Sequence, residues 1–136
     1  MEVYQESFRL QQEIFTMSKK IPTEERYSLT DQIRRSSRSI GANLAESWAK
    51  RRYPAHFLSK LTDADGELQE TLHWISSAAA CAYLSEREAQ RLMEHAAAVG
   101  RLMEHAAAVG RLMEHAAAVG RLLGSTINNY QSFCSR

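Results

Sequence analysis

Residues 28–52, SLTDQIRRSSRSIGANLAESWAKRR, predict one amphipathic helix around which the rest of the fold is organised. Ser28 is a residue type that accepts a backbone N–H of a first helical turn, and Asp31 puts a carboxylate near the positive end of the helix dipole. At about 100° per residue, six side chains fall on one stripe. The expected core face of this helix is Leu29, Ile33, Ser37, Ile40, Leu44 and Trp48.

One flank of this helix is rich in arginine. It carries Arg34, Arg38 and Arg52, and Lys50 and Arg51 add positive charge at the helix end. Guanidinium groups bind phosphates as two-pronged donors, so these five residues form a candidate nucleic-acid-binding edge. The alternative is that the arginines form ion pairs with acidic residues of a following helix or of a neighbouring subunit: Asp63, Glu67 and Glu70.

Length and composition indicate an ordinary globular protein. The chain has 136 residues, 44% hydrophobic and 24% charged, with a formal net charge of +1, which argues against a nucleic-acid binder of high overall charge. The N-terminus is too polar for a signal peptide, no apolar run approaches the roughly 20 residues of a membrane helix, and the two cysteines suggest no disulfide framework. We therefore expect a cytoplasmic protein without membrane contact.

Three further helices are predicted around the central one. Pro22 ends the first helix soon after Lys20, and Pro54 suits the first turn of the third. Ser85 and Glu88 have capping-box spacing at the start of the fourth. Short connections place consecutive helices antiparallel. We expect an all-α, antiparallel up-and-down four-helix bundle in one domain, residues 1–136, with helices at about 2–20, 29–51, 54–82 and 86–127.

The first and third helices have their own apolar stripes. In the first helix the side chains expected at helical spacing are Tyr4, Phe8, Gln11, Ile14, Phe15 and Ser18. In the third helix they are Phe57, Leu61, Ala64, Leu68, Leu72, Ile75, Ala79 and Ala82.

The sequence RLMEHAAAVG occurs three times without change in residues 91–120. Its Ala, Leu, Met and Glu content favours one continuous helix over a solenoid, although each repeat glycine costs about 1 kcal/mol relative to alanine. Ten residues turn about 1000°, so each copy is rotated by roughly −80° from the previous one. A helix over residues 85–127 would be about 60 Å long. We therefore expect it to project beyond the bundle.

The sequence gives no support for catalysis or for a cofactor. It contains no phosphate-binding glycine loop, HExxH motif, nucleophile elbow or dinucleotide fingerprint. His95, His105 and His115 differ in helix azimuth and lack a second ligand at helical spacing, so they are interpreted as solvent-facing or interfacial side chains. We expect neither an enzyme nor a metal site.

The chain resembles the four-helix-bundle proteins that are often encoded within intervening sequences of bacterial 23S ribosomal RNA genes. The resemblance rests on residues 25–47, 51–74 and 119–127. In that family the fourth helix has no tandem repeat, so about two of the three copies look like an insertion. A related accessory protein of diversity-generating retroelements binds nucleic acid and a reverse transcriptase. Such proteins look like ring-shaped homopentamers with basic surfaces, which implies a pentamer here.

The resemblance also implies a subunit interface. The family's polar motif residues that this chain carries are Arg35, Asn43, Glu46 and Glu70. Two hypotheses for function follow. The first is a self-assembling bundle that binds RNA or DNA through the arginine-rich edge. The second is a structural or adaptor oligomer that binds a protein partner and uses its arginines in intersubunit salt bridges.

Overall fold

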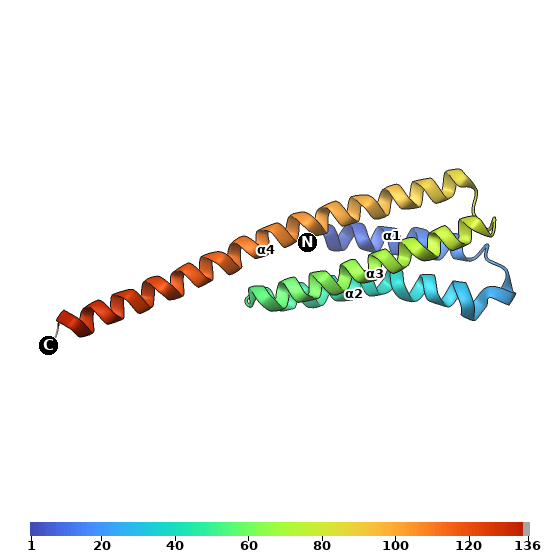
Figure 1. Cartoon of the computed structure of the whole chain (residues 1–136). Coiled ribbons are helices and arrows are strands. Elements are labelled where there is room, and N and C mark those ends of the chain that lie inside the picture. Colours follow the sequence, from blue (N-terminus) through green and yellow to red (C-terminus); the bar gives the residue numbers. More distant parts are fainter. Residues whose placement is uncertain (135–136) are drawn as a thin grey trace.

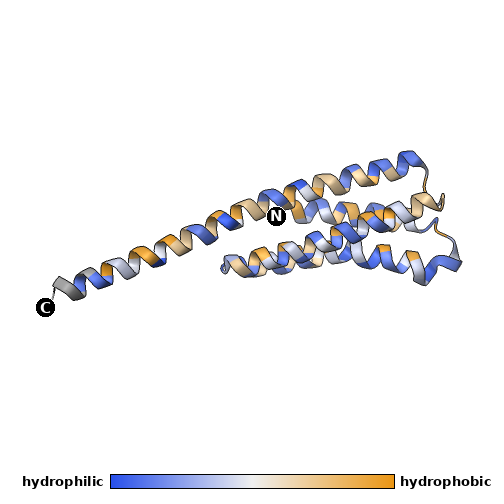
Figure 2. Ribbon diagram, in the orientation of Figure 1, coloured by the Kyte–Doolittle hydropathy of each residue, from blue (hydrophilic) through white to orange (hydrophobic). Residues whose placement is uncertain are grey.

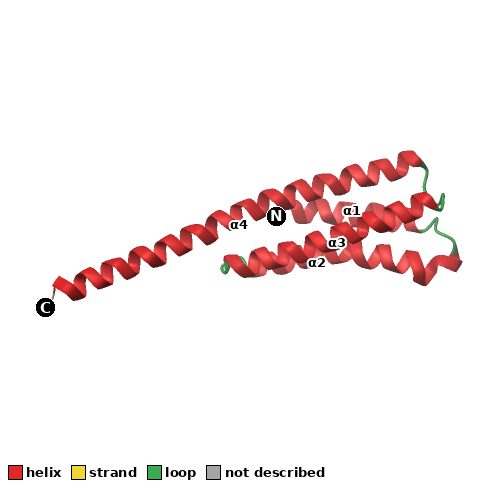
Figure 3. Cartoon of the chain, viewed as in Figure 1, coloured by secondary structure: helices red, strands yellow, loops and turns green. Residues whose placement is uncertain are grey.

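The computed structural model describes the backbone of residues 1–134, which form four helices and, within that range, no strand (Figures 1 and 3). Consecutive helices run antiparallel, as the sequence predicted for an up-and-down bundle (Figure 1). None of these helices is both long and apolar enough to cross a membrane. The helices are α1 (Glu2–Ser18), α2 (Asp31–Ala49), α3 (Pro54–Ala80) and α4 (Glu86–Cys134).

The entry to α2 differs from the prediction. A 3-10 turn (Thr23–Glu25) and a π-helical turn (Arg26–Thr30) lead directly into α2. Ser28 therefore lies inside a helical run rather than at its start. Its Oγ donates to Glu25 Oε1 at 2.7 Å, and the predicted N-cap is wrong. The preceding helical turns leave no free first turn of α2 for Ser28 to cap.

The predicted core face of α2 is correct except at its last turn. Five of its six side chains are buried, but Trp48 is 51% exposed and lies outside the core. Ser47 is buried instead, and the Arg51 guanidinium covers the Trp48 ring at 4.5 Å from its centroid. The buried members of the predicted stripe are Leu29, Ile33, Ser37, Ile40 and Leu44.

The stripe of α1 is rotated from the expected one. Tyr4 and Phe8 are exposed, because α1 approaches α2 through small residues. A Cβ added at Gly41 of α2 would lie 3.5 Å from Ser7 Oγ, so these two small residues face each other between α1 and α2. The core side chains of α1 are Val3, Leu10, Ile14 and Met17.

Two positions in α3 also correct the prediction. Leu72 and Ala79 were predicted to be core residues but are only half-buried. Thr71 and Ala78 are fully buried instead. Ala82 lies beyond the helix end, with a positive φ of 59° in the turn to α4. The remaining predicted core residues of α3 are buried: Phe57, Leu61, Ala64, Leu68 and Ile75.

Helix α4 is continuous through all three repeat copies and projects well beyond the other helices (Figure 1). Its 49 residues extend about 73 Å at about 1.5 Å per residue. The predicted capping box forms, since Glu88 N donates to Ser85 Oγ at 3.1 Å and Ser85 N to Glu88 Oε1 at 3.4 Å. The first part packs on α1 and α3, whereas the far part leaves apolar side chains in solvent (Figure 2).

Candidate functional site

The structure divides the predicted nucleic-acid-binding edge into two groups. Arg34 and Arg38 lie in the middle of α2. Helix α2 ends at Ala49, so Arg52 belongs to the following turn and does not share a helical flank with them. Fourteen residues of helix would span about 21 Å, which indicates how far apart the two groups lie along the bundle. The single continuous edge predicted from the sequence is therefore wrong.

The two arginines of the first group, together with Lys19 of α1, surround one aromatic ring, Phe15 of α1. Lys19 Nζ lies 4.9 Å from the ring centroid. The Cζ atoms of Arg34 and Arg38 lie 4.7 and 5.7 Å from it. Arg34 Nε also donates to Ser18 Oγ at 2.7 Å, which fixes its guanidinium further. We call Phe15, Lys19, Arg34 and Arg38 the Phe15 cluster. Cation–π attraction holds these charges together at the surface despite their mutual repulsion.

The Phe15 cluster borders a shallow hollow of about 470 Å³. Within residues 1–134, no ion pair joins Lys19, Arg34 or Arg38 to a carboxylate. Their N–H groups are therefore able to donate to an anion. The hollow is lined by Asp31, Arg34, Arg35, Arg38, Ser39 and Ala42.

Arg35, the neighbour of Arg34, is in a different situation because it pairs across α2 and α3. Its guanidinium binds Glu70 and lies 3.4 Å from Glu67 Oε2. The hydrogen bond to Glu70 raises the pKa of Arg35, and the same bond lowers the pKa of Glu70. Burial raises the pKa of Glu67, although Arg35 opposes that shift. The charge of Arg35 is therefore used in ion pairs between α2 and α3.

The other residues of the predicted subunit interface also have partners within the chain. Glu46 Oε2 lies 2.7 Å from Lys60 Nζ, and the hydrogen bond from Lys60 lowers the pKa of Glu46. Asn43 Nδ2 donates to the carbonyl oxygen of Ser39 at 2.9 Å. Within residues 1–134 the predicted ion pairs between the arginine-rich edge and α3 are not formed; Arg35, which lies outside that edge, pairs with Glu67 and Glu70 instead. A role of these residues at a subunit contact stays a prediction.

In the second group, Lys50, Arg51 and Arg52 are exposed. Arg51 Nη1 donates to the Trp48 carbonyl oxygen at 3.0 Å, and its guanidinium stacks on the Trp48 ring. This group is a second, smaller basic surface at the α2–α3 turn.

His95 packs inside the bundle, whereas the sequence predicted that it would lie in solvent or at an interface. Its side chain is only 17% exposed, and its ring nitrogens lie 3.1 Å from Glu6 Oε2 and 3.1 Å from Glu13 Oε1 of α1. The hydrogen bond with His95 lowers the pKa of Glu6. His105 and His115 have the same neighbours in sequence but are exposed. No group of three His, Cys, Asp or Glu side chains in residues 1–134 is placed to hold a metal ion.

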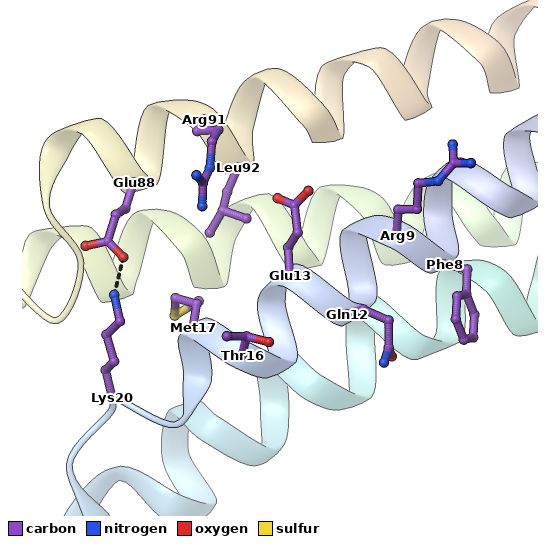
Figure 4. A pocket seen from close by; sticks show the side chains of 10 residues that line it. All are labelled: Phe8, Arg9, Gln12, Glu13, Thr16, Met17, Lys20, Glu88, Arg91 and Leu92. Carbon is purple, nitrogen blue, oxygen red and sulfur yellow. Dashed lines mark hydrogen bonds and ion pairs between the residues drawn. The ribbon is translucent and has the colours of Figure 1, made fainter.

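A second hollow, of about 590 Å³, lies between α1 and α4 (Figure 4). Lys20 pairs with Glu88 at one end of it, and Arg9, Glu13 and Arg91 also border it. Its charges are mixed and it is open to solvent, so it presents no single chemistry for a ligand.

Known proteins share the fold of this chain, and one protein family matches its sequence. A crystal structure of a protein with unknown function from the S23 ribosomal protein family of Bacteroides thetaiotaomicron is similar, with a TM-score of 0.70 and 24% identity. The similarity covers 77% of this chain and 97% of that one, so the two share the fold. No curated protein matches the chain. The family model for the 23S rRNA-intervening sequence protein matches residues 1–105 and ends within the second repeat copy. The chain therefore belongs to the family of 23S rRNA-intervening sequence proteins.

Proposed function

We propose that this chain is a cytoplasmic, non-enzymatic protein that self-assembles and binds the phosphate backbone of RNA or DNA through the Phe15 cluster. The observation that carries the proposal is the contrast between adjacent arginines. Arg35 is neutralised by Glu67 and Glu70, whereas the half-buried Arg34 and the exposed Arg38 lie beside a third cation and have no carboxylate partner within residues 1–134.

The geometry of the Phe15 cluster suits a phosphate. The ring of Phe15 restrains Arg34 and Arg38 in place, so less side-chain freedom is lost when an anion binds. Each guanidinium offers several N–H donors, which match phosphate oxygens in pairs. Because the contact is with phosphate rather than with bases, it selects for backbone and not for sequence.

The test is replacement of Arg34 and Arg38 together by glutamine. The matched control replaces Arg111 and Arg121 of the projecting part of α4, which removes the same charge from another surface. Fluorescence anisotropy with RNA and DNA oligonucleotides is measured at several salt concentrations. Each lost phosphate contact should lower the slope of log affinity against log salt by about 1. Affinity that is equal in the two double variants would contradict the proposal.

One observation favours the second candidate function, an oligomer that binds a protein partner. The projecting part of α4 exposes large apolar side chains, among them Leu112 at 69% and Ile127 at 56%. Apolar surface of this kind is typical of protein contacts. Mass-resolved sizing with and without nucleic acid separates the two candidates. The second candidate predicts a pentamer-sized species that does not bind nucleic acid. If this species also dissociates when Arg34 and Arg38 are replaced, the arginines form intersubunit salt bridges.

A further inference from the structure

The repeat gives α4 two segments of identical sequence that fit the same surface. Residues 91–110 form the part of α4 that packs on α1 and α3, and residues 101–120 repeat their sequence without a change. The first segment is seated on the bundle, and the last ten residues of the second lie in solvent (Figure 2). A helix moved by ten residues would therefore present the same side chains at the same positions.

We propose that α4 occupies two registers on the bundle: the observed one, and one in which residues 101–120 take the places of residues 91–110. The second register reproduces the apolar contacts that residues 91–110 make in the first. Leu102 replaces Leu92, which is 2% exposed, and Val109 replaces the fully buried Val99. The exposed Val109 thereby gains the burial that Val99 gives up.

The polar contacts are reproduced as well. His95 is held between Glu6 and Glu13 in the observed register. In the shifted register His105 reaches the same two carboxylates, because residues 101–110 follow the same helical path with the same side chains. The shift therefore leaves neither carboxylate without its histidine partner.

A glycine limits the shift to one step. A Cβ added at Gly110 would lie 2.9 Å from Phe57 Cδ1 and 3.0 Å from Leu58 Cδ2, so this position accepts only glycine without rearrangement. After a shift of ten residues Gly120 stands there. After a shift of twenty residues the residue at this position would be Tyr130, whose side chain is far larger than the space allows. Two registers fit, and a third does not.

The α3–α4 connection makes the observed register the more stable of the two. In the shifted register residues 86–95 join the linker, so the Ser85–Glu88 capping box and the Lys20–Glu88 ion pair are lost. Val99 takes the place of Ala89, beside a hollow of about 480 Å³ that has room for the larger side chain. The projecting helix becomes about 15 Å shorter.

Crosslinking between α1 and α4 tests the two registers directly. Cys81 and Cys134 are replaced by serine, and Glu13→Cys is combined in turn with His95→Cys, His105→Cys or His115→Cys. A short thiol-reactive crosslinker is added, and crosslinked monomers are separated by mass. The first pair reports the observed register, the second the shifted one, and the third a register that Gly110 forbids. We expect the 13–105 product to form faster in the full chain than in a chain that lacks one repeat copy and therefore cannot shift.

A charge in the core should drive the change of register. Leu92→Lys places an ammonium in the core of the observed register, whereas in the shifted register residue 92 lies in the solvated linker. We expect this substitution to raise the 13–105 product above the 13–95 product while the protein stays folded.

Deletion of one repeat copy supplies the control. Removal of any one copy gives the same sequence, which keeps the contacts of residues 91–110 but cannot shift. Leu92→Lys should therefore lower the Tm of this shorter chain more than that of the full chain. Equal falls in Tm, or a 13–105 product that forms as fast in the shorter chain as in the full chain, would overturn the proposal.

Discussion

The three identical repeat copies allow one substitution to be compared at the same position of the repeat in different tertiary environments. Leu92 is 2% exposed in the core, and Leu112 is 69% exposed on the projecting part of α4. Leu92→Ala removes buried methyl groups and leaves a cavity, which costs about 3 kcal/mol within a usual range of about 2–5 kcal/mol. Leu112→Ala removes little buried surface, so its cost should stay within about 0.5 kcal/mol.

Thermal and urea unfolding followed by circular dichroism measure this difference. For a chain of this size, about 3 kcal/mol corresponds to a fall in Tm of roughly 10–15 °C. The residues that follow the two leucines within the repeat are identical, and only those before Arg91 and Arg111 differ (EAQ against AVG), so the difference reports mainly tertiary packing. Equal losses for the two variants would show that residues 111–120 are packed in solution as residues 91–100 are. No loss for Leu92→Ala would show that this side chain does not fill the core.

Three further predictions test other parts of the structure. Gly110→Ala should lower stability by about 1–3 kcal/mol through overpacking, whereas Gly120→Ala, with open space around it, should not lower it; thermal melts of both variants decide this. Ser85→Ala should cost about 1 kcal/mol in urea unfolding, because the α4 capping box is lost. The Arg35 hydrogen bond lowers the pKa of Glu70 below 4.5, so its stabilisation is present above that pH and is lost as pH falls through the folded-state pKa. Glu70→Gln should therefore flatten the acid side of the stability–pH curve, and an unchanged curve would contradict this.

The sequence was sufficient to predict the four helices, because the residue patterns that mark a helix and its ends are local. Periodicity over a few turns, Pro54 at a helix start and the capping spacing of Ser85 and Glu88 depend only on neighbouring residues, and the structure agrees with them. The same locality explains the errors. Ser28 has the chemistry of an N-cap, but the preceding turns are already helical, which its own neighbours do not reveal.

The candidate site was only partly predictable for the same reason. The sequence placed Arg34 and Arg38 on one flank of a helix, but the ring that gathers them comes from α1. It also offered ion pairs between the edge arginines and α3 as an alternative, whereas the arginine that pairs with α3 is Arg35, outside that edge. Which of several adjacent cations is neutralised depends on the distance and rotation between two packed helices.

The repeat shows most clearly which properties follow from local sequence and which follow from tertiary packing. The sequence alone determined that residues 91–120 are helical, that the helix is continuous and that it exceeds the length of the bundle, since these properties follow from composition and rise per residue. Only the tertiary structure decided that His95 lies between two carboxylates while His115 lies in solvent. Their local sequences are the same, so the difference comes entirely from where α1 and α3 end beside α4.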